Sequence, residues 1–467
     1  MRLSEIIKDS GAIILHGSAE TEIDGIFSDS RKVVPGSLFI AVKGLAVDGH
    51  DYIDAALAAG AEAVISTDRH GLAICAANRY GHPSEKLTLV GITGTNGKTT
   101  TVTLLYQLFM GLGYNCGLLS TIANFVGTRR SETENTTADP ITINSLMAEM
   151  VEAGCEYCFM EVSSIGVEQE RVAGLKFKVA IFSNLTHDHL DYHKTFAEYL
   201  RCKKLFFDGL DKDATAIINI DDRNGMVMVQ NCKAKLVTYS CRELADHTCR
   251  IVEESFEGMM LKVDDTEVWT RLIGRHNAYN LLAIYSAALA VGADKQEALV
   301  ALSSLESASG RLETLRGPRN LSVIIDYAHT PDALDNVLST LRGIARDTEL
   351  ICLFGCGGDR DKTKRPEMAA IAQKYADRIF VTSDNSRTEK TEDILEDIRK
   401  GFDNAGLAKS IFIADRREAI RASIMMAPEG AAILLAGKGH ETYQIIGKEK
   451  RHFDEREVVN EVFASIG

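Results

Sequence analysis

The chain has 467 residues, enough for about three domains with buried cores of their own. Its hydrophobic fraction of 45% and charged fraction of 25% are those of an ordinary globular protein and exclude a collagen-like, coiled-coil or disordered chain. The 66 acidic residues outnumber the 52 basic ones, giving a net charge of −14, which argues against a dedicated nucleic-acid-binding protein.

The first region, residues 1–88, reads as a small α/β domain. Short apolar runs predict strands over 37–42 and 63–65, and an alanine-rich stretch predicts a helix over 52–59. The polar stretch 78–86 contains a glycine and a proline and is interpreted as a linker.

The second region, residues 89–309, alternates apolar runs with helical patterns. After the apolar run 87–92 and a glycine-containing turn, leucines recur at helical spacing over 104–112. Further strand-like runs lie at 157–160, 179–182 and 216–220. The alternation predicts a parallel sheet covered by helices.

The third region, residues 310–467, repeats this pattern with polar or glycine-rich loops. Its five apolar runs lie at 323–325, 350–354, 379–381, 411–413 and 433–435. Ligands in open α/β sheets bind beyond the carboxyl ends of the strands, so four of the loops are predicted to share one ligand-facing edge. The fold class predicted for the whole chain is therefore α/β with three domains.

The chain is predicted to be cytoplasmic and to bind no membrane. It has no run of about 18 apolar residues, and its first ten residues lack the apolar core of a signal peptide. The ten cysteines are scattered, as reduced thiols are in a cytosolic protein. Cys155 and Cys158 form a C-x-x-C without a second pair, and we interpret them as small buried residues rather than a zinc or redox site.

The strongest motif is GTNGKTT at 94–100, between a predicted strand and a predicted helix. Backbone N–H groups of such a loop bind phosphates, Lys98 adds a point charge, and a following threonine hydroxyl can ligate Mg²⁺. The common G-x-x-x-x-G-K-T pattern would place glycine where this chain has Ile92, so the motif is a variant. The alternative, a glycine-rich connector with a chance lysine, does not explain the repeated threonines.

The stretch HDHLDYH at 187–193 follows another predicted strand. Its imidazoles and carboxylates indicate either a metal site or a solvated loop. Glu161, at the end of a neighbouring apolar run, favours a Mg²⁺ held by Thr99, Glu161, one imidazole and triphosphate oxygens. Lys203 lies in a segment whose pattern alone favours the basic face of an amphipathic helix.

Two features of the third region indicate binding of an anion or an amino acid. Arg360 opens a basic stretch at 360–365 beside three glycines, which is either a carboxylate or phosphate site or an exposed basic helix start. Arg387 and Glu441 lie on separate loops of one sheet edge. They are suited to clamp an amino acid by both its ends, or they form an ordinary surface ion pair.

Taken together, these motifs resemble the Mur ligase family, and within it the MurE type, in order over essentially the whole chain. The motifs that carry the resemblance are SDSR at 28–31, GTNGKTT at 94–100, NTT at 135–137, MEVSS at 160–164, NLTHDHLD at 184–191, GRHN at 274–277, GRLE at 310–313, DYAHTP at 326–331, GGDRD at 357–361, DNSR at 384–387 and GKGHE at 437–441.

The resemblance implies an ATP-dependent acid–amino-acid ligase with ATP and Mg²⁺ as cofactors. It implies a UDP-binding domain over 1–88, a central ATP-binding domain of the P-loop ATPase type over 89–309, and a Rossmann-like amino-acid-binding domain over 310–467. The enzyme would add meso-diaminopimelate to UDP-N-acetylmuramoyl-L-alanyl-D-glutamate through an acyl phosphate in cytoplasmic peptidoglycan synthesis. A monomer with small-molecule substrates is expected.

The resemblance also assigns roles to individual residues. Lys98, Glu161, His189 and a carbamylated Lys203 would be catalytic, and Thr99, Glu161, His189 and Lys203 would serve the metal. ATP would be bound by Gly94, Thr95, Asn96, Gly97, Lys98, Thr99, Thr100, Asn277, Arg311 and Asp326. The muramoyl-dipeptide substrate would be bound by Ser28, Ser30, Asn135, Thr136, Thr137, Ser163, Gln169 and Arg171. The incoming amino acid would be bound by Arg360, Asp384, Asn385, Ser386, Arg387, Gly437 and Glu441.

The identity of the added amino acid rests on Arg387. The family motif for diaminopimelate is DNPR, and this chain has Ser386 in place of the proline. The arginine would pair with the distal carboxylate of diaminopimelate, which lysine lacks. The alternatives are the same ligase adding L-lysine, a ligase like folylpolyglutamate synthetase, and a regulatory P-loop ATPase. A metallohydrolase built on 187–193 and an inactive binding module are more distant alternatives.

Overall fold

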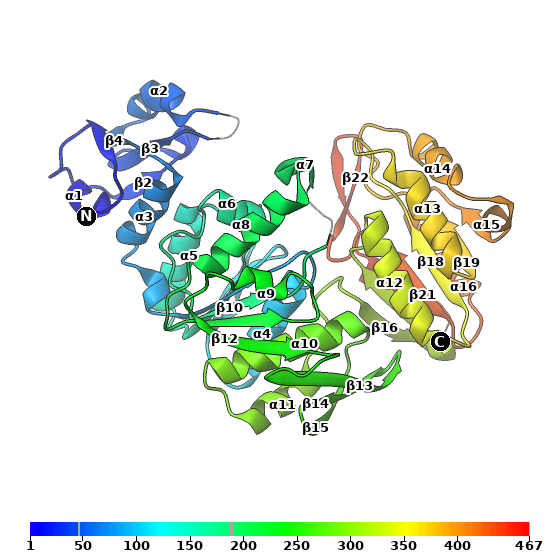
Figure 1. The fold of residues 1–467 in the computed structure, drawn as a ribbon. Coiled ribbons are helices and arrows are strands. Elements are labelled where there is room, and N and C mark those ends of the chain that lie inside the picture. The colour runs from blue at the N-terminus through cyan, green and yellow to red at the C-terminus, as the bar shows by residue number, and fades with distance from the viewer. Residues whose placement is uncertain (45–46, 187–189, 467) are drawn as a thin grey trace. The chain divides into compact units, whose positions relative to one another are not determined.

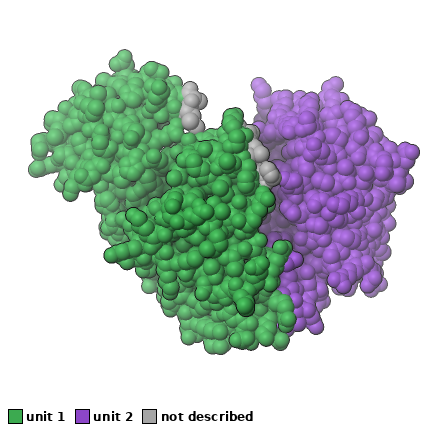
Figure 2. Space-filling view, in the orientation of Figure 1, with its two compact units in different colours: residues 1–250, 262–268, 278–303 green, residues 251–261, 269–277, 304–467 purple. Residues whose placement is uncertain are grey.

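The computed structural model describes residues 1–44, 47–186 and 190–466. The chain divides into two compact units (Figure 2). Unit 1 comprises residues 1–250, 262–268 and 278–303, and unit 2 comprises 251–261, 269–277 and 304–467. The larger sheets follow one another along the chain, so the architecture is α/β as predicted. The three domain boundaries stay a prediction.

The N-terminal sheet has four strands in the order β1-β4-β3-β2, of which β2, β3 and β4 are parallel (Figure 1). Its elements are α1 (Leu3–Ile6), β1 (Ile13–His16), β2 (Gly25–Phe27), η1 (Ser30–Lys32), β3 (Ser37–Val42), η2 (Gly49–Tyr52), α2 (Ile53–Ala58), β4 (Ala61–Thr67), α3 (Arg69–Arg79) and η3 (Pro83–Glu85). In β3, Leu38 and Ile40 pack into one apolar cluster, whereas Phe39 and Ala41 pack into another. Because side chains alternate along a strand, both faces of the sheet are covered.

The predicted strands and helix of this region are confirmed. The predicted linker at 78–86 is partly structured, because α3 extends to Arg79 and η3 follows.

The central sheet has eleven strands in the order β15-β14-β13-β12-β11-β10-β5-β9-β6-β7-β8. The run from β12 to β6 is parallel, as predicted. Its strands are β5 (Thr88–Thr93), β6 (Cys116–Leu119), β7 (Asn124–Val126), β8 (Arg129–Ser131), β9 (Tyr157–Glu161), β10 (Val179–Phe182), β11 (Thr215–Asn219), β12 (Lys235–Ser240), β13 (His247–Ser255), β14 (Gly258–Val263) and β15 (Thr266–Thr270). Its helices are α4 (Lys98–Gly111), α5 (Pro140–Glu152), α6 (Ser164–Glu168), α7 (Leu190–His193), α8 (Phe196–Asp208), α9 (Gly225–Met228), α10 (Arg275–Ala290) and α11 (Lys295–Ser304).

The C-terminal sheet has six strands in the order β16-β17-β21-β18-β19-β20. Its elements are β16 (Glu313–Gly317), η4 (Pro318–Asn320), β17 (Leu321–Asp326), α12 (Pro331–Ile344), β18 (Leu350–Phe354), α13 (Lys364–Tyr375), β19 (Arg378–Val381), α14 (Thr391–Arg399), α15 (Asn404–Ala408), β20 (Ser410–Phe412), α16 (Arg416–Met425), β21 (Ala432–Ala436), β22 (Tyr443–Ile446), β23 (Glu449–His452) and α17 (Glu455–Ile466). All five predicted strands are present, and β21 lies between β17 and β18. The loops after these parallel strands therefore lie at one edge of the sheet, as expected.

Both faces of this sheet are buried. Cys352 and Phe354 of β18 pack in a cluster with α12, α13 and α14, whereas Ile351 and Leu353 pack with α16 and α17. Because successive side chains of a strand point to opposite faces of the sheet, β18 packs against the helices on both sides.

Within the described residues, no helix is long and apolar enough to cross a membrane. All ten cysteines are free thiols, as predicted. Cys158 is fully buried, and burial raises its pKa, so the C-x-x-C is a packing feature of β9.

Candidate active site

The loop between β5 and α4 is held by hydrogen bonds to residues that follow β10 in unit 1. The N–H of Asn96 donates to Asn184 Oδ1 at 2.9 Å, and Ser183 Oγ donates to the Asn96 carbonyl at 2.7 Å. Gly97 ends the loop with φ of +88°, and a Cβ there would lie 2.5 Å from Asn280 Oδ1. Only glycine fits both the left-handed backbone and this close approach. The loop therefore presents the N-terminus of α4, which is the arrangement that binds phosphate.

Two lysines meet at this loop. Lys98 Nζ donates to the carbonyls of Gly94 and Thr95 at 2.8 and 2.9 Å. Lys203 Nζ, on α8, donates to the same Gly94 carbonyl at 2.8 Å and to Thr93 Oγ1 at 3.4 Å. Lys203 is 1% exposed. The interpretation of Lys203 from its pattern alone, as part of a solvated basic face, is therefore wrong, because α8 turns this residue inward beneath the loop.

Glu161 closes β9, the neighbour of β5 in the sheet. Its Oε1 accepts a hydrogen bond from the Thr121 N–H at 2.8 Å. Its Oε2 is buried and has no hydrogen-bond partner among the described residues. A buried carboxylate oxygen without a donor is costly unless a cation binds it, so the site fits a Mg²⁺ ion. Thr99, on the first turn of α4, is also buried, as a hydroxyl ligand beside this loop would be.

His189 was predicted as a further metal ligand and lies outside the described residues. Among the described residues, no group of three or more His, Cys, Asp or Glu side chains lies together. A Mg²⁺ ion held by one carboxylate, a hydroxyl and phosphate oxygens does not need such a group. Binding of magnesium by His189 and carbamylation of Lys203 therefore stay predictions.

The residues assigned to the muramoyl dipeptide form a connected network beside Glu161. Thr137 Oγ1 donates to the Glu161 carbonyl at 2.9 Å and accepts from the Ser163 N–H at 3.0 Å. Arg171 donates to the Thr137 carbonyl at 2.6 Å and to Gln169 Oε1 at 2.8 Å. The structure thus gathers Thr137, Ser163, Gln169 and Arg171 in one place.

The remaining dipeptide residues are dispersed. Thr136 accepts a hydrogen bond from Thr121 Oγ1 at 3.1 Å, which ties it to the loop that contacts Glu161, and the Asn135 carbonyl accepts one from Thr133. Ser28 and Ser30 follow β2 in the N-terminal sheet. Asp29 lies between these two serines, and Arg31 donates to both of its carboxylate oxygens and lowers its pKa to about 2. Contact of Ser28 and Ser30 with a uridine stays a prediction.

The other residues assigned to ATP lie in unit 2. The Asp326 carboxylate, at the end of β17, accepts from the N–H groups of Leu312 and Ala328 at 2.8 and 2.9 Å. Burial raises its pKa, against the opposing effect of Arg311 and of these hydrogen bonds. Arg311 lies over the ring of Tyr327, with 5.2 Å from its Cζ to the ring centroid.

Asn277 is buried near the start of α10 and donates to the Ile273 carbonyl at 2.8 Å. It stays a prediction that one bound nucleotide contacts the phosphate loop together with Asn277, Arg311 and Asp326.

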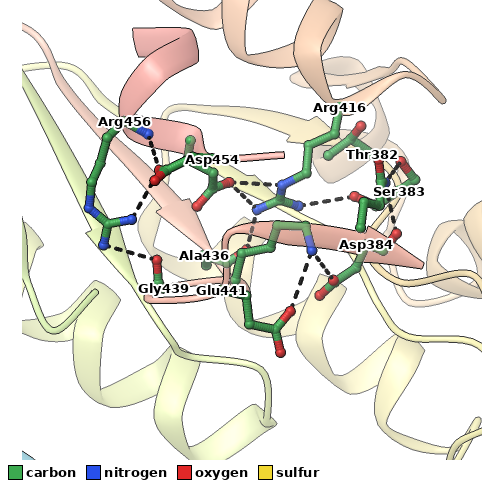
Figure 3. A network of polar contacts seen from close by, with 12 residues as sticks. Thr382, Ser383, Asp384, Arg416, Ala436, Gly439, Glu441, Asp454 and Arg456 are labelled. Atoms are coloured by element: carbon green, nitrogen blue, oxygen red, sulfur yellow. Dashed lines mark hydrogen bonds and ion pairs between the residues drawn. The ribbon is translucent and has the colours of Figure 1, made fainter. Parts of the chain in front are cut away.

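Several residues that were predicted to bind the incoming amino acid, among them Asp384 and Glu441, lie together at the ligand-facing edge of the C-terminal sheet (Figure 3). Asn385 Nδ2 donates to Glu441 Oε2 at 2.9 Å, and a Cβ on Gly437 would lie 3.0 Å from Asp384 Oδ2. Asp384 is 7% exposed. Burial disfavours its ionisation, but Lys438 and Arg416 outweigh this effect and hold its pKa below the usual value.

Arg387 lies beside this group with φ of +50°. Its Nη1 donates to the Gly358 carbonyl at 2.9 Å, and its Nε and Nη2 make no hydrogen bond among the described residues. Two donors of one guanidinium therefore remain for a carboxylate. Arg387 and Glu441 do not form the direct ion pair considered from the sequence; Glu441 instead pairs with Lys438 at 3.4 Å.

The basic stretch 360–365 is not a single anion-binding patch. Arg365 is fully buried, and its guanidinium is held by Glu389 and Asp397 at 2.9 Å each. Lys362 also pairs with Glu389, at 2.9 Å. Because acidic residues distant in sequence neutralise these cations, only Arg360 is an exposed cation in this stretch without an ion pair among the described residues. Ser386 is buried.

Sequence reasoning missed the buried groups that hold this edge together. Arg416, fully buried at the start of α16, donates to Glu455 Oε1, to the Ser383 carbonyl and to the Ala436 carbonyl (Figure 3). It thereby joins the ends of β19 and β21, which carry Asp384 and Gly437. Neighbouring arginines at 416 and 417 look alike in the sequence, so no local signal distinguishes them.

Comparison with known proteins decides the family. The Mur ligase family catalytic domain matches residues 22–88, the Mur ligase middle domain matches 92–289, and the Mur ligase glutamate ligase domain matches 310–439. The chain belongs to the Mur ligase family. The UDP-N-acetylmuramoyl-L-alanyl-D-glutamate–2,6-diaminopimelate ligase of Parabacteroides distasonis is 47% identical over 100% of this chain and 99% of that protein.

Solved structures agree with this assignment. A structure of a UDP-N-acetylmuramoyl-L-alanyl-D-glutamate–2,6-diaminopimelate ligase is 32% identical, with a TM-score of 0.74 over 100% of this chain and 99% of that one. The MurF ligase of Thermotoga maritima in complex with ADP has a TM-score of 0.65 at 18% identity, over 96% and 99% of the two chains. The latter comparison shows that this Mur ligase shares its fold with a more distant member.

Proposed function

We propose that the chain is an ATP-dependent ligase that joins meso-diaminopimelate to UDP-N-acetylmuramoyl-L-alanyl-D-glutamate in peptidoglycan synthesis. The observation that carries this proposal is the group formed by Asp384, Asn385, Arg387 and Glu441 at one sheet edge. It offers the buried carboxylate of Asp384 and the partly buried carboxylate of Glu441 to an ammonium group, and the guanidinium of Arg387, with two open donors, to a carboxylate. The full-length identity of 47% to a diaminopimelate ligase supports the same reaction.

The reaction has two steps. The carboxylate of the precursor attacks the γ-phosphorus of ATP, which forms an acyl phosphate and releases ADP. The amine of the diamino acid then attacks the acyl carbon, a C–N bond forms, the C–O bond to phosphate breaks, and the amine loses a proton. Little covalent chemistry falls to the protein, whose contribution is positioning and charge stabilisation.

The residues of this chain divide these tasks. The phosphate loop and Lys98 bind the phosphates of ATP, and Thr137, Ser163 and Arg171 hold the muramoyl-peptide part of the precursor. Thr99, Glu161, His189 and a carbamylated Lys203 would hold Mg²⁺, which when bound would neutralise phosphate charge. Asp384 and Glu441 bind the ammonium of the diamino acid, and Arg387 binds its distal carboxylate.

We extend the proposal to three domains bounded at 1–88, 89–309 and 310–467, which bind the uridine end, ATP and the amino acid. The succession along the chain of a four-stranded sheet, an eleven-stranded sheet and a six-stranded sheet followed by a two-stranded one supports it. The cytoplasmic location and the monomeric state stay predictions from the sequence.

The test is reconstitution with purified protein, Mg-ATP and the precursor, with and without diaminopimelate. We expect phosphate release that requires diaminopimelate, together with a product whose mass is that of the tripeptide. Lys98→Met serves as the control, because a ligase loses both signals and a metallohydrolase would keep its activity. Phosphate release without a product would instead support an ATPase.

A further inference from the structure

Lys438 occupies the centre of the amino-acid group, although no motif argument singled it out. Its side chain is fully buried on the loop after β21. Its Nζ donates to the Tyr443 carbonyl at 2.7 Å, to Asn385 Oδ1 at 3.2 Å and to Glu441 Oε2 at 3.4 Å. It also lies 3.5 Å from Asp384 Oδ1. Three of the residues proposed to receive the amino acid thus share one ammonium group.

We propose that Lys438 is a positioning residue for the incoming amino acid: its ammonium group holds Asp384, Asn385 and Glu441 in the geometry that receives the diamino acid. The inference rests on the proposed function and deepens it, because Lys438 acts through these three residues and not by contact with the reacting atoms.

The orientation of the Asn385 amide depends on this lysine. Asn385 Oδ1 accepts from Lys438 Nζ and from the Ile445 N–H at 2.9 Å, so Nδ2 points to Glu441 Oε2 at 2.9 Å. An amide turned the other way would place its oxygen against the Glu441 carboxylate and its NH₂ group against the lysine, two repulsive contacts. Lys438 and the Ile445 N–H therefore together fix which side of Asn385 faces the carboxylate.

The charge count at this point favours binding of a further cation. Asp384 and Glu441 supply two carboxylates around one ammonium, since Arg416 is engaged by Glu455. Lys438 stabilises the buried carboxylate of Asp384 and the partly buried one of Glu441, and it leaves one negative charge of the pair uncompensated. An incoming ammonium group supplies the missing charge.

The same lysine sets the pH at which the pocket loses its charge. Lys438, Arg416 and His329 face Asp384 and favour its ionised form, while Tyr327, Tyr443, Cys356 and Glu441 are further titratable groups near it among the described residues. Removing Lys438 removes a positive charge, so the pKa of Asp384 rises. Loss of amino-acid binding on acidification then begins at a higher pH than in the wild type.

The experiment measures steady-state tripeptide synthesis by wild type, Lys438→Met, Lys438→Arg and the matched control Lys409→Met. Lys409 also donates to two backbone carbonyls, those of Gln373 and Ala376, but contacts no residue of the pocket. For Lys438→Met we expect KM for diaminopimelate to rise at least tenfold, with KM for ATP and for the precursor within twofold of wild type. Lys438→Arg should recover part of this loss, and Lys409→Met should behave as wild type.

The pH profile of kcat/KM for diaminopimelate should show its acidic limb shifted to higher pH in Lys438→Met alone. The inference is overturned if KM for diaminopimelate stays within twofold of wild type, or if all three KM values rise together and Lys438→Arg is no better than Lys438→Met. A wild-type protein that makes no tripeptide would instead overturn the proposed function. An active wild type with an unchanged variant overturns only the role of Lys438.

Discussion

The two binding regions of this Mur ligase treat buried carboxylates in opposite ways. In unit 1, Glu161 keeps one buried oxygen without a hydrogen-bond partner among the described residues. In unit 2, Asp384 and Glu441 already surround Lys438, and Arg416 already pairs with Glu455. The first site has a carboxylate oxygen without a donor, whereas the second already holds one ammonium group between two carboxylates and keeps one negative charge for an incoming cation. In the proposed function, the first arrangement suits a bound metal ion and the second suits the ammonium group of an amino acid.

The largest effect is expected where an internal ion pair of unit 2 is broken. Glu455→Gln removes the carboxylate partner of the fully buried Arg416, which we expect to cost about 3–5 kcal/mol of unfolding free energy. The matched control is Glu461→Gln on the same helix, whose partner Arg417 is exposed, and its cost should stay below about 1 kcal/mol. Chemical denaturation monitored by circular dichroism measures both. Equal losses would show that the buried pair does not organise unit 2.

At Glu161 we expect a substitution to lower activity without lowering stability, in contrast to Glu455→Gln. Glu161→Gln keeps an acceptor for the Thr121 N–H but removes the charge, so synthesis should fall by about 100-fold or more. The melting temperature should stay equal or rise, because a buried unpaired charge is lost. Activity and thermal unfolding are measured on the same preparation. A fall in stability with activity retained would contradict the assignment of Glu161 to a bound cation.

A smaller effect tests the phosphate loop. Gly97→Ala adds a Cβ against Asn280 at a backbone φ of +88°, so KM for ATP should rise by about tenfold. Gly113 has a similar φ of +92° with nothing within 4 Å of the added Cβ, which makes Gly113→Ala the control for backbone strain alone. Gly113→Ala should lower stability and leave KM for ATP unchanged. If both variants raise KM for ATP equally, backbone strain explains the result, and the contact between the added Cβ and Asn280 does not.

The smallest effect concerns pH. Hydrogen bonds from Arg365 and Lys362 lower the pKa of Glu389 to about 2. Because the folded-state pKa is depressed, this stabilisation is present above about pH 4.5 and is lost as pH falls toward 2. Glu389→Gln should therefore melt below wild type at pH 7, and the difference should narrow on acidification. Glu429→Gln, at an exposed carboxylate without an ion pair among the described residues, should show no such trend.

Features encoded by residues that are adjacent in the sequence could be predicted from it. The phosphate loop can be recognised because one strand, one turn and one helix carry it, and the buried strands of the parallel sheets are apolar runs. The hairpin of β22 and β23 was not predicted, because its residues are mostly polar or exposed. Neither were Lys438 and Arg416, since their burial depends on chain segments distant in sequence. Arg365 was misjudged for the same reason: its partners Glu389 and Asp397 lie 24 and 32 residues away.

The measurement that tests the account most directly is a competition between the two candidate amino acids. Wild type and Arg387→Ala receive Mg-ATP, the precursor and equal concentrations of meso-diaminopimelate and L-lysine, and mass spectrometry gives the ratio of the two tripeptides. Wild type should make the diaminopimelate product almost exclusively, and Arg387→Ala should lose most of this preference. A wild type that prefers lysine, or a preference unchanged without Arg387, would contradict the account.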